Sequence, residues 1–439
     1  MTVAVRDASV MSRSAAPAQS RWLSADLLLG LGLSVVAALG SFHLSARVPA
    51  PVMTAPSCVD VWFEADAPYI FDSMTHGDSQ HHRRSRRHPL FSLVSRPAVR
   101  VVQILPLTPL QAVRVVMALV TALWAATLFA LLRVIGCRRP EALCFTAVAI
   151  VSAPAVFWFS VSETWGFGSL TILLALLIVA IGLRRALSTG WYLLASALTL
   201  SMTTTNWMTG LVILATRLRW RRALAYALAT IGVVVACELV QKQLFPHAAL
   251  RPKTGQTSRY IFQLDSGGPL MTTQVFFAGA MVMPKLMQTI RSSHARALIP
   301  ALRLTAQHAP PGSGSPWGAV AVILWLILLG LGAWGALTTV RLRPFVIVAG
   351  LTLVGHFLLH NVYGGEEVFL YSLHWAPVLV VVAACSVFTP ARRVALALAA
   401  LLVIAAGVNN VRALDEGAAL LRREPAVMQA QAQQVNPVN

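Results

Sequence analysis

Glu64 and Asp66 are the first residues whose types and spacing could support chemistry. They stand two positions apart in VDVWFEADAPYIFDSMTHGDSQHHRRSRRHPLFSL, which runs from Val59 to Leu93. In an extended segment they would face the same way, whereas on a helix they would diverge by about 200°. Nearby apolar side chains could partly desolvate a carboxylate and raise its pKa, which suits a general base. An ordinary solvated acidic loop would have the same spacing.

A dense cationic run follows in the same stretch. HHRRSRRH holds four arginines and three histidines in eight residues, among them His81, His82, Arg83, Arg84 and His88. Guanidinium groups bind phosphate bidentately, so the run suits the phosphate of a lipid-linked substrate. Adhesion to anionic lipid headgroups is the alternative.

A second polar cluster lies late in the chain, in GHFLLHNVYGGEEVFLYSLHWAP. His356 and His360 are four residues apart, on one helical face. A turn at the two glycines 364 and 365 would bring them near the residues that follow, which include Glu366, Glu367, Tyr371 and His374. Two histidines and a carboxylate can bind zinc or iron, but HExxH is absent and contact with substrate or phosphate is favoured.

Glu163 is a further candidate, because it directly follows an apolar run and precedes Trp165. An ionisable group at the boundary of a membrane span is a functional candidate by default. A solvated glutamate at a helix N-terminus is the plainer alternative.

Long apolar runs must position these residues. Hydrophobic residues make up 57% of the 439 and charged residues 12%, well below the quarter or so that is usual in soluble domains. Runs long enough to cross a bilayer, or nearly so, occur at 22–46, 110–133, 141–160, 167–183, 223–245, 317–339, 344–361, 367–388 and 394–409. The net charge of +19 comes largely from arginine clusters between these runs, so nucleic-acid binding is not expected.

The segment 190–216 is a special case, because both its ends carry the charge of cytoplasmic loops. It is too short for two full crossings, so we expect two short helices that meet at SMTTTNW, or a re-entrant pair. Counted as two crossings, it gives an all-α, polytopic transmembrane bundle of about eleven spans, with partly helical outer loops.

The positive-inside rule predicts the orientation and the division of the chain. Residues 1–21 form a cytoplasmic segment, 22–410 the membrane domain and 411–439 a polar tail. The loops 47–109 and 246–316 lie outside. Most acidic residues then lie on the outer side, so an active site would face outward.

At this point the sequence resembles the polytopic GT-C glycosyltransferases, which use lipid-phosphate-linked sugars. These enzymes carry a paired acidic motif in the first outer loop, where Glu64-Ala65-Asp66 stands here, and HPLFSL is similar to a segment that follows that loop in several bacterial members. The predicted topology is also similar. The resemblance implies an integral protein of a bacterial plasma membrane.

The resemblance also implies inverting transfer of a sugar from a polyprenyl-phosphate donor to an acceptor that remains unknown. Asp66, or else Glu64, would take the proton from the acceptor. His81, Arg83, Arg84 and His88 would stabilise the departing phosphate. Some members use a divalent metal and others do not, so the cofactor stays open.

A transporter or flippase of a lipid-linked or anionic substrate is the rival hypothesis. Glu238 within an apolar run and the broken segment 190–216 motivate it. A non-catalytic component of an envelope assembly pathway is a third possibility.

Overall fold

The computed structural model describes residues 16–249, 261, 267–291, 301–363 and 367–423. Within them, six helical segments are long and apolar enough to cross a membrane. They comprise α1 (Ala16–Arg47), α5 (Pro109–Ile135), α11 (Trp220–Leu244), α13 (Pro316–Thr338), α14 (Arg343–Val362, with the short turn before it) and α16 (Arg392–Arg423). A seventh would be the bent pair Val368–His374 and Ala376–Phe388, whose two parts meet at 52°. The prediction of an all-α polytopic bundle is confirmed.

The described spans are fewer than the eleven predicted, because several apolar runs form short or broken helices. Run 141–160 divides into α6 (Arg139–Ile150) and α7 (Ala153–Trp158), where Ser152 caps α7 and Pro154 follows in its first turn. Run 167–183 forms α8 (Trp165–Ile181), which is shorter than a usual span.

The break predicted in 190–216 is present. Helix α9 (Thr189–Met202) ends where Thr203 becomes extended, and α10 (Trp207–Arg217) begins after one 3-10 turn. The two short helices pack against each other. The backbone around the break bonds to the first loop: Leu90 N donates to Ser201 O at 2.7 Å, and Thr204 N donates to Arg87 O at 3.0 Å. The break therefore supports the segment that carries the cationic run.

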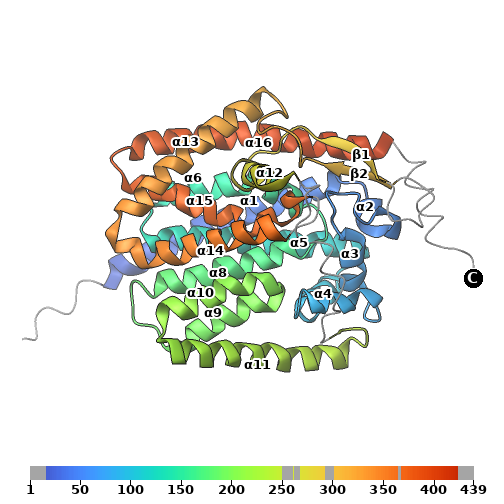
Figure 1. Cartoon of the computed structure of the whole chain (residues 1–439), viewed down its shortest axis with the longest axis horizontal. Coiled ribbons are helices and arrows are strands. Elements are labelled where there is room, and N and C mark those ends of the chain that lie inside the picture. Colours follow the sequence, from blue (N-terminus) through green and yellow to red (C-terminus); the bar gives the residue numbers. More distant parts are fainter. Residues whose placement is uncertain (1–15, 250–260, 262–266, 292–300, 364–366, 424–439) are drawn as a thin grey trace, which may run out of the picture.

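The long helices lie roughly along the long axis of the molecule, and the helices of the first predicted outer loop lie at one end with the β hairpin of the second, on the right in Figure 1. From the first loop come α2 (Pro51–Thr54), α3 (Ala67–Thr75) and α4 (Phe91–Val102). From the second come α12 (Gly268–Gln274) and a hairpin of β1 (Met287–Arg291) and β2 (Ala301–Thr305), antiparallel with Met287 opposite Thr305. The first loop and the hairpin of the second loop thus share one end of the bundle, whereas α12 lies nearer its middle in Figure 1.

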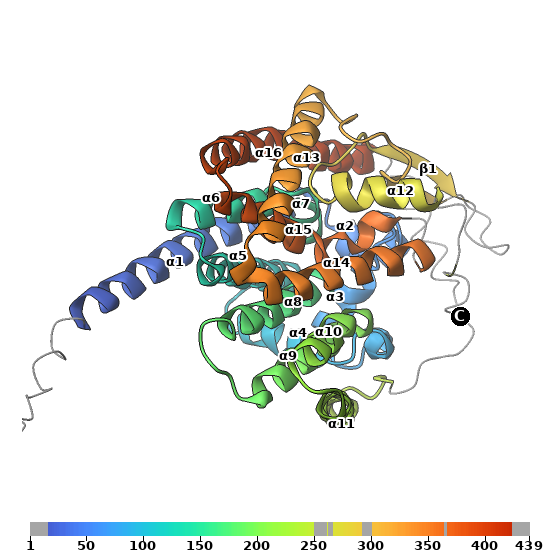
Figure 2. The same cartoon turned by 60° about the vertical axis from the view of Figure 1, so that its left-hand side comes forward.

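Helix α16 continues through Arg423, so the first part of the segment that we assigned to the polar tail is helical. Asn409 and Asn410, near its middle, fix it to the neighbouring chain. Asn410 Nδ2 donates to Val151 O at 2.7 Å and to Met281 O at 2.9 Å, and Asn409 Nδ2 donates to Met283 O at 2.8 Å. These bonds satisfy the backbone carbonyl directly after α6, at Val151, and two carbonyls of the second loop, at Met281 and Met283. Figure 2 shows α16 beside α6 and α13.

Candidate functional site

The acidic motif lies in a tight loop with an unusual backbone. Asp60, Phe63 and Glu64 all adopt left-handed conformations, with φ of 65°, 49° and 60°. Such conformations cost a non-glycine residue about 1–2 kcal/mol each, so the surroundings must hold them. Internal hydrogen bonds join Asp60 N to Ala65 O at 3.0 Å and Ala65 N to Trp62 O at 2.9 Å. Strain of this kind concentrates at functional sites.

Buried aromatic rings anchor this loop. The fully buried ring of Phe63 makes edge contacts with Phe157 and Phe369, with centroids 5.4 and 5.6 Å apart. Trp62 stacks on Phe157 at 5.6 Å. On the other side of the loop, Leu304 N of β2 donates to Val61 O at 2.9 Å. The buried aromatic side chains therefore fix the backbone of the loop directly before Glu64 and Asp66.

Asp66 is held from two directions. Its backbone N–H donates to Glu163 Oε1 at 2.8 Å, and its carboxylate forms an ion pair with Arg84. The predicted base, one predicted phosphate ligand and the isolated glutamate before Trp165 therefore lie together. Glu163 is buried between α7 and α8 and also accepts from Thr164 N at 2.9 Å.

Glu64 has different partners, which the sequence analysis did not identify. Arg303 on β2 forms an ion pair with Glu64 at 2.7 Å, and the backbone N–H of Glu367 approaches the other oxygen at 3.3 Å. Two residues further along β2, Thr305 donates to Glu367 Oε2 at 2.5 Å. The side chains of Arg303 and Thr305 share one face of the strand, as its alternation requires. We call Asp60, Glu64, Asp66, Glu163 and Glu367, with Arg84 and Arg303, the acid cluster.

Burial and neighbouring charges change the pKa values of several residues in the acid cluster. The pKa of Glu163 is raised to about 7, first by burial and then by the charge of Asp66. The pKa of Asp60 is also raised to about 7, by desolvation and by the charges of Asp66 and Glu64, although Asp60 keeps one side open to solvent that screens those charges. Burial lowers the pKa of Arg84, but the charges of Asp66 and Glu163 outweigh this effect and raise it. Arg84 therefore stays cationic.

The cationic run forms a 3-10 turn, Gln80–Arg86, that divides its side chains between two directions. Arg84 points to the acid cluster, whereas Arg83 and Arg87 are exposed. His82 is buried away from the cluster, where its two ring nitrogens bond to Ser92 and to the carbonyl of His76. The structure therefore does not bring His82 to Asp66.

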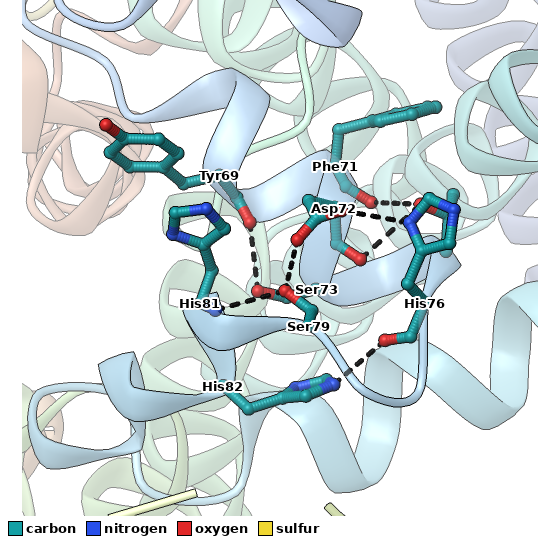
Figure 3. Close-up of polar contacts among 9 residues, drawn as sticks. Tyr69, Phe71, Asp72, Ser73, His76, Ser79, His81 and His82 are labelled. Carbon is teal, nitrogen blue, oxygen red and sulfur yellow. Dashed lines mark hydrogen bonds and ion pairs between the residues drawn. The ribbon is translucent and has the colours of Figure 1, made fainter. Parts of the chain in front are cut away.

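His81 lies at the edge of the acid cluster. Its ring stacks on Tyr69 with centroids 4.0 Å apart, as Figure 3 shows. Its backbone N–H donates to Ser79 Oγ at 3.1 Å, and Ser79 in turn bonds to Asp72, which also bonds to His76 at 2.9 Å. This chain of polar contacts ties the start of the cationic run to α3, the helix that Asp66 precedes.

His88 is not the cation that the sequence analysis expected. It is buried, one ring nitrogen bonds to Met202 O at 3.0 Å, and burial lowers its pKa to about 3. A histidine of that kind is neutral at ordinary pH and has one N–H, which His88 donates to Met202 O, so it has no donor left for a phosphate. A small cleft nonetheless joins His88 to Arg84, His81 and Thr164.

The late histidines form a second cluster behind Trp165. The Trp165 ring contacts His88 at 5.5 Å on one side and His374 and Tyr371 at 5.3 and 5.1 Å on the other. His360 stacks on Tyr371 at 4.8 Å. His360, Tyr371 and His374 thus meet as predicted, but they reach the first loop through Trp165 rather than through its carboxylates. Glu366 lies outside the described residues.

Within the described ranges, no group of three or more His, Cys, Asp or Glu side chains could hold a metal ion. Two carboxylates of the acid cluster already pair with guanidinium groups.

Comparison with known proteins shows similarity of fold. No protein-family model and no curated protein matches the chain. Among solved structures, ArnT from Cupriavidus metallidurans bound to undecaprenyl phosphate aligns with a TM-score of 0.57 and 14% identity, over 92% of this chain and 78% of ArnT. The apo oligosaccharyltransferase of Archaeoglobus fulgidus aligns with a TM-score of 0.49 and 11% identity, over 89% of this chain and 56% of its own. The chain therefore has the polytopic helical fold of ArnT.

Proposed function

We propose that the protein is a membrane glycosyltransferase that moves a sugar from a polyprenyl-phosphate-linked donor to an acceptor on the outer face of the membrane. One observation carries the proposal: Asp66 and Glu64, from the motif of the first loop, lie in one cluster with the cations Arg84 and Arg303. A base beside cations is what transfer from a phosphate leaving group requires. The fold of ArnT, whose structure contains undecaprenyl phosphate, supports the choice of donor.

In the proposed reaction, Asp66 accepts the proton of the acceptor's nucleophilic group. The bond from that group to the anomeric carbon forms as the bond from the same carbon to the phosphate oxygen breaks. The phosphate leaves with the bonding electrons, and Arg84 and Arg303 stabilise its charge. Attack opposite the leaving group inverts the anomeric configuration.

The ion pair between Arg84 and Asp66 fits this scheme. A phosphate that binds Arg84 competes with Asp66 for the same guanidinium, so donor binding would free the carboxylate to act as a base. His81, at the edge of the acid cluster, and the exposed Arg83 would extend the phosphate contact.

The test is the Asp66→Asn variant, assayed in proteoliposomes for release of polyprenyl phosphate from a panel of polyprenyl-phosphate-linked sugars with membrane extract as the acceptor source. Loss of a general base costs about 10²–10⁴-fold in rate, and we expect a loss in that range. Asp78→Asn is the matched control, since Asp78 is an exposed aspartate in the same loop, and it should release polyprenyl phosphate at the normal rate. Normal release by Asp66→Asn would remove Asp66 as the base.

The position of Glu238, which motivated the transporter hypothesis, gives that hypothesis little support. Glu238 is half-buried on α11, which lies at the edge of the bundle in Figure 1 and is little buried by the rest of the chain. An ion path would run through the interior instead. Uptake of a lipid-linked or anionic substrate into proteoliposomes, without release of polyprenyl phosphate from any donor, would favour the transporter.

A further inference from the structure

Helix α4 exposes an apolar face, which is unusual for a segment outside the membrane spans. Its buried face is formed by Phe91, Ser92, Ser95 and Val99. Its exposed face carries Val94 and Val101, 44% and 65% exposed, and Ile104 and Leu105 just beyond the helix continue it at 83% and 59%. Val94 and Val101 are seven residues apart, about two helical turns, so their side chains form one stripe along the helix.

Both ends of α4 are fixed to ends of membrane spans. At its start, Leu93 N donates to Gln241 Oε1 at 2.9 Å, and Gln241 Nε2 donates to Pro89 O at 2.7 Å. Gln241 is buried in the last turn of span α11. At its other end, a short connection leads directly to Pro109, the first residue of span α5. A helix of 12 residues, about 18 Å long, therefore runs along one boundary of the membrane layer.

Two arginines flank the apolar stripe. Arg96 and Arg100 are one helical turn apart, Arg96 half-buried and Arg100 exposed. Neither forms an ion pair with a described residue, and Arg96 Nη1 is buried with no hydrogen-bond partner among those residues. Burial and the neighbouring charge of Arg100 lower the pKa of Arg96. Two adjacent guanidinium groups without a carboxylate between them form a site for an anion.

We propose that α4 lies in the membrane–water interface and that Arg96 and Arg100 bind the phosphate of an anionic membrane phospholipid. The apolar stripe enters the acyl boundary, and the two guanidinium groups remain at headgroup level, as in other interfacial helices. Arg96 and Arg100 lie on α4, whereas the proposed site for the sugar donor lies at Arg84 in the acid cluster. The lipid that the two arginines bind is therefore one of the surrounding bilayer and not the sugar donor. The proposal is independent of the proposed reaction.

The test places the photocrosslinker p-benzoylphenylalanine at Val101 in the full chain. The protein is reconstituted in vesicles of roughly three parts phosphatidylcholine to one part phosphatidylglycerol, and the crosslinked lipid is identified by mass spectrometry. We expect the ratio of crosslinked phosphatidylglycerol to phosphatidylcholine to be about fivefold or more above that of the bilayer, since each arginine at an anionic surface contributes about that factor. The Arg96→Gln/Arg100→Gln double variant should return the ratio to that of the bilayer.

Two controls distinguish this site from general lipid contact. The same crosslinker at Ile231, an exposed position within span α11, should capture both lipids at the bilayer ratio. The Arg221→Gln/Arg222→Gln double variant, at the opposite end of α11, should leave enrichment at position 101 unchanged. Crosslinks from position 101 to the protein itself or to no lipid would overturn the interfacial placement. Lipid capture at the bilayer ratio, unaffected by the α4 double variant, would overturn the anion site.

Discussion

At Glu163, burial and the neighbouring Asp66 raise the pKa of a carboxyl from its ordinary value to about 7. A carboxyl whose pKa is raised by folding adds stability below its unfolded pKa and loses that contribution as pH rises through the folded value. We therefore expect the melting temperature to fall between about pH 4.5 and 7, partly through Glu163.

The Glu163→Gln variant should flatten that pH dependence, by a few degrees across the window. It should also be less stable than the wild type, because the amide has one oxygen to accept from Asp66 N and Thr164 N, whereas the carboxyl group has two. Thermal unfolding in detergent at several pH values measures both effects. Glu416→Gln, at an exposed position on α16, is the control and should keep the wild-type slope. An unchanged slope in Glu163→Gln would contradict the assignment.

Among single residues, the sequence identified those with a local signal. Glu64 and Asp66 were found by their spacing and Arg84 by the density of its run, and the structure brings all three into one cluster. Arg303 was missed, since it stands in no local motif and its contact with Glu64 depends on the pairing of β2 with residues near position 62. His88 was misjudged as a cation because its burial depends on α9, which is more than a hundred residues away.

At the scale of elements, the left-handed loop depends on its aromatic anchor. The Phe63→Ala variant should destabilise the protein by about 3–5 kcal/mol, as loss of a fully buried phenylalanine usually does. It should also release the strained backbone of Glu64 and abolish transfer. Thermal unfolding and the polyprenyl-phosphate release assay measure the two effects. Phe42→Ala, which removes a partly exposed ring on α1, should leave transfer intact; equal loss in both variants would count against a specific anchor.

The elements themselves were predictable to different degrees. Apolar length located the long helices, and the polar run SMTTTNW located the break between α9 and α10. The hairpin of β1 and β2 had no such signal, because its strands are short and β2 gains its position from contacts with the first loop. The division of 141–160 at Ser152 was also missed, although Ser152 and Pro154 are typical of a helix start.

At the scale of the whole molecule, the bundle depends on close helix contacts at glycine. A Cβ added at Gly332 of α13 would lie 2.3 Å from Val382 O and 2.4 Å from Ala383 Cα, both in the backbone of α15 (Ala376–Ala384). The Gly332→Ala variant should therefore separate α13 from α15 and cost at least about 1–3 kcal/mol.

Gly330 provides the matched comparison for that prediction. It lies on the same helix two residues earlier, and a Cβ there meets nothing within 4 Å. Gly330→Ala should be neutral or slightly stabilising, by up to about 1 kcal/mol. Thermal unfolding of the two variants in the same detergent distinguishes them, and equal stability would show that the α13–α15 contact tolerates expansion.

The acid cluster spans most of the chain: Glu64 meets the backbone of Glu367, 303 residues later, and Arg303 comes from between them. A membrane protein is inserted from its N-terminus onward, so the first loop is made long before its partners. Until β2 and the segment after α14 arrive, Glu64 has neither its guanidinium nor its backbone donor. A chain that stalls or inserts a late helix in the wrong direction cannot complete this cluster. The acid cluster is therefore complete only in a chain whose late elements have reached their native positions.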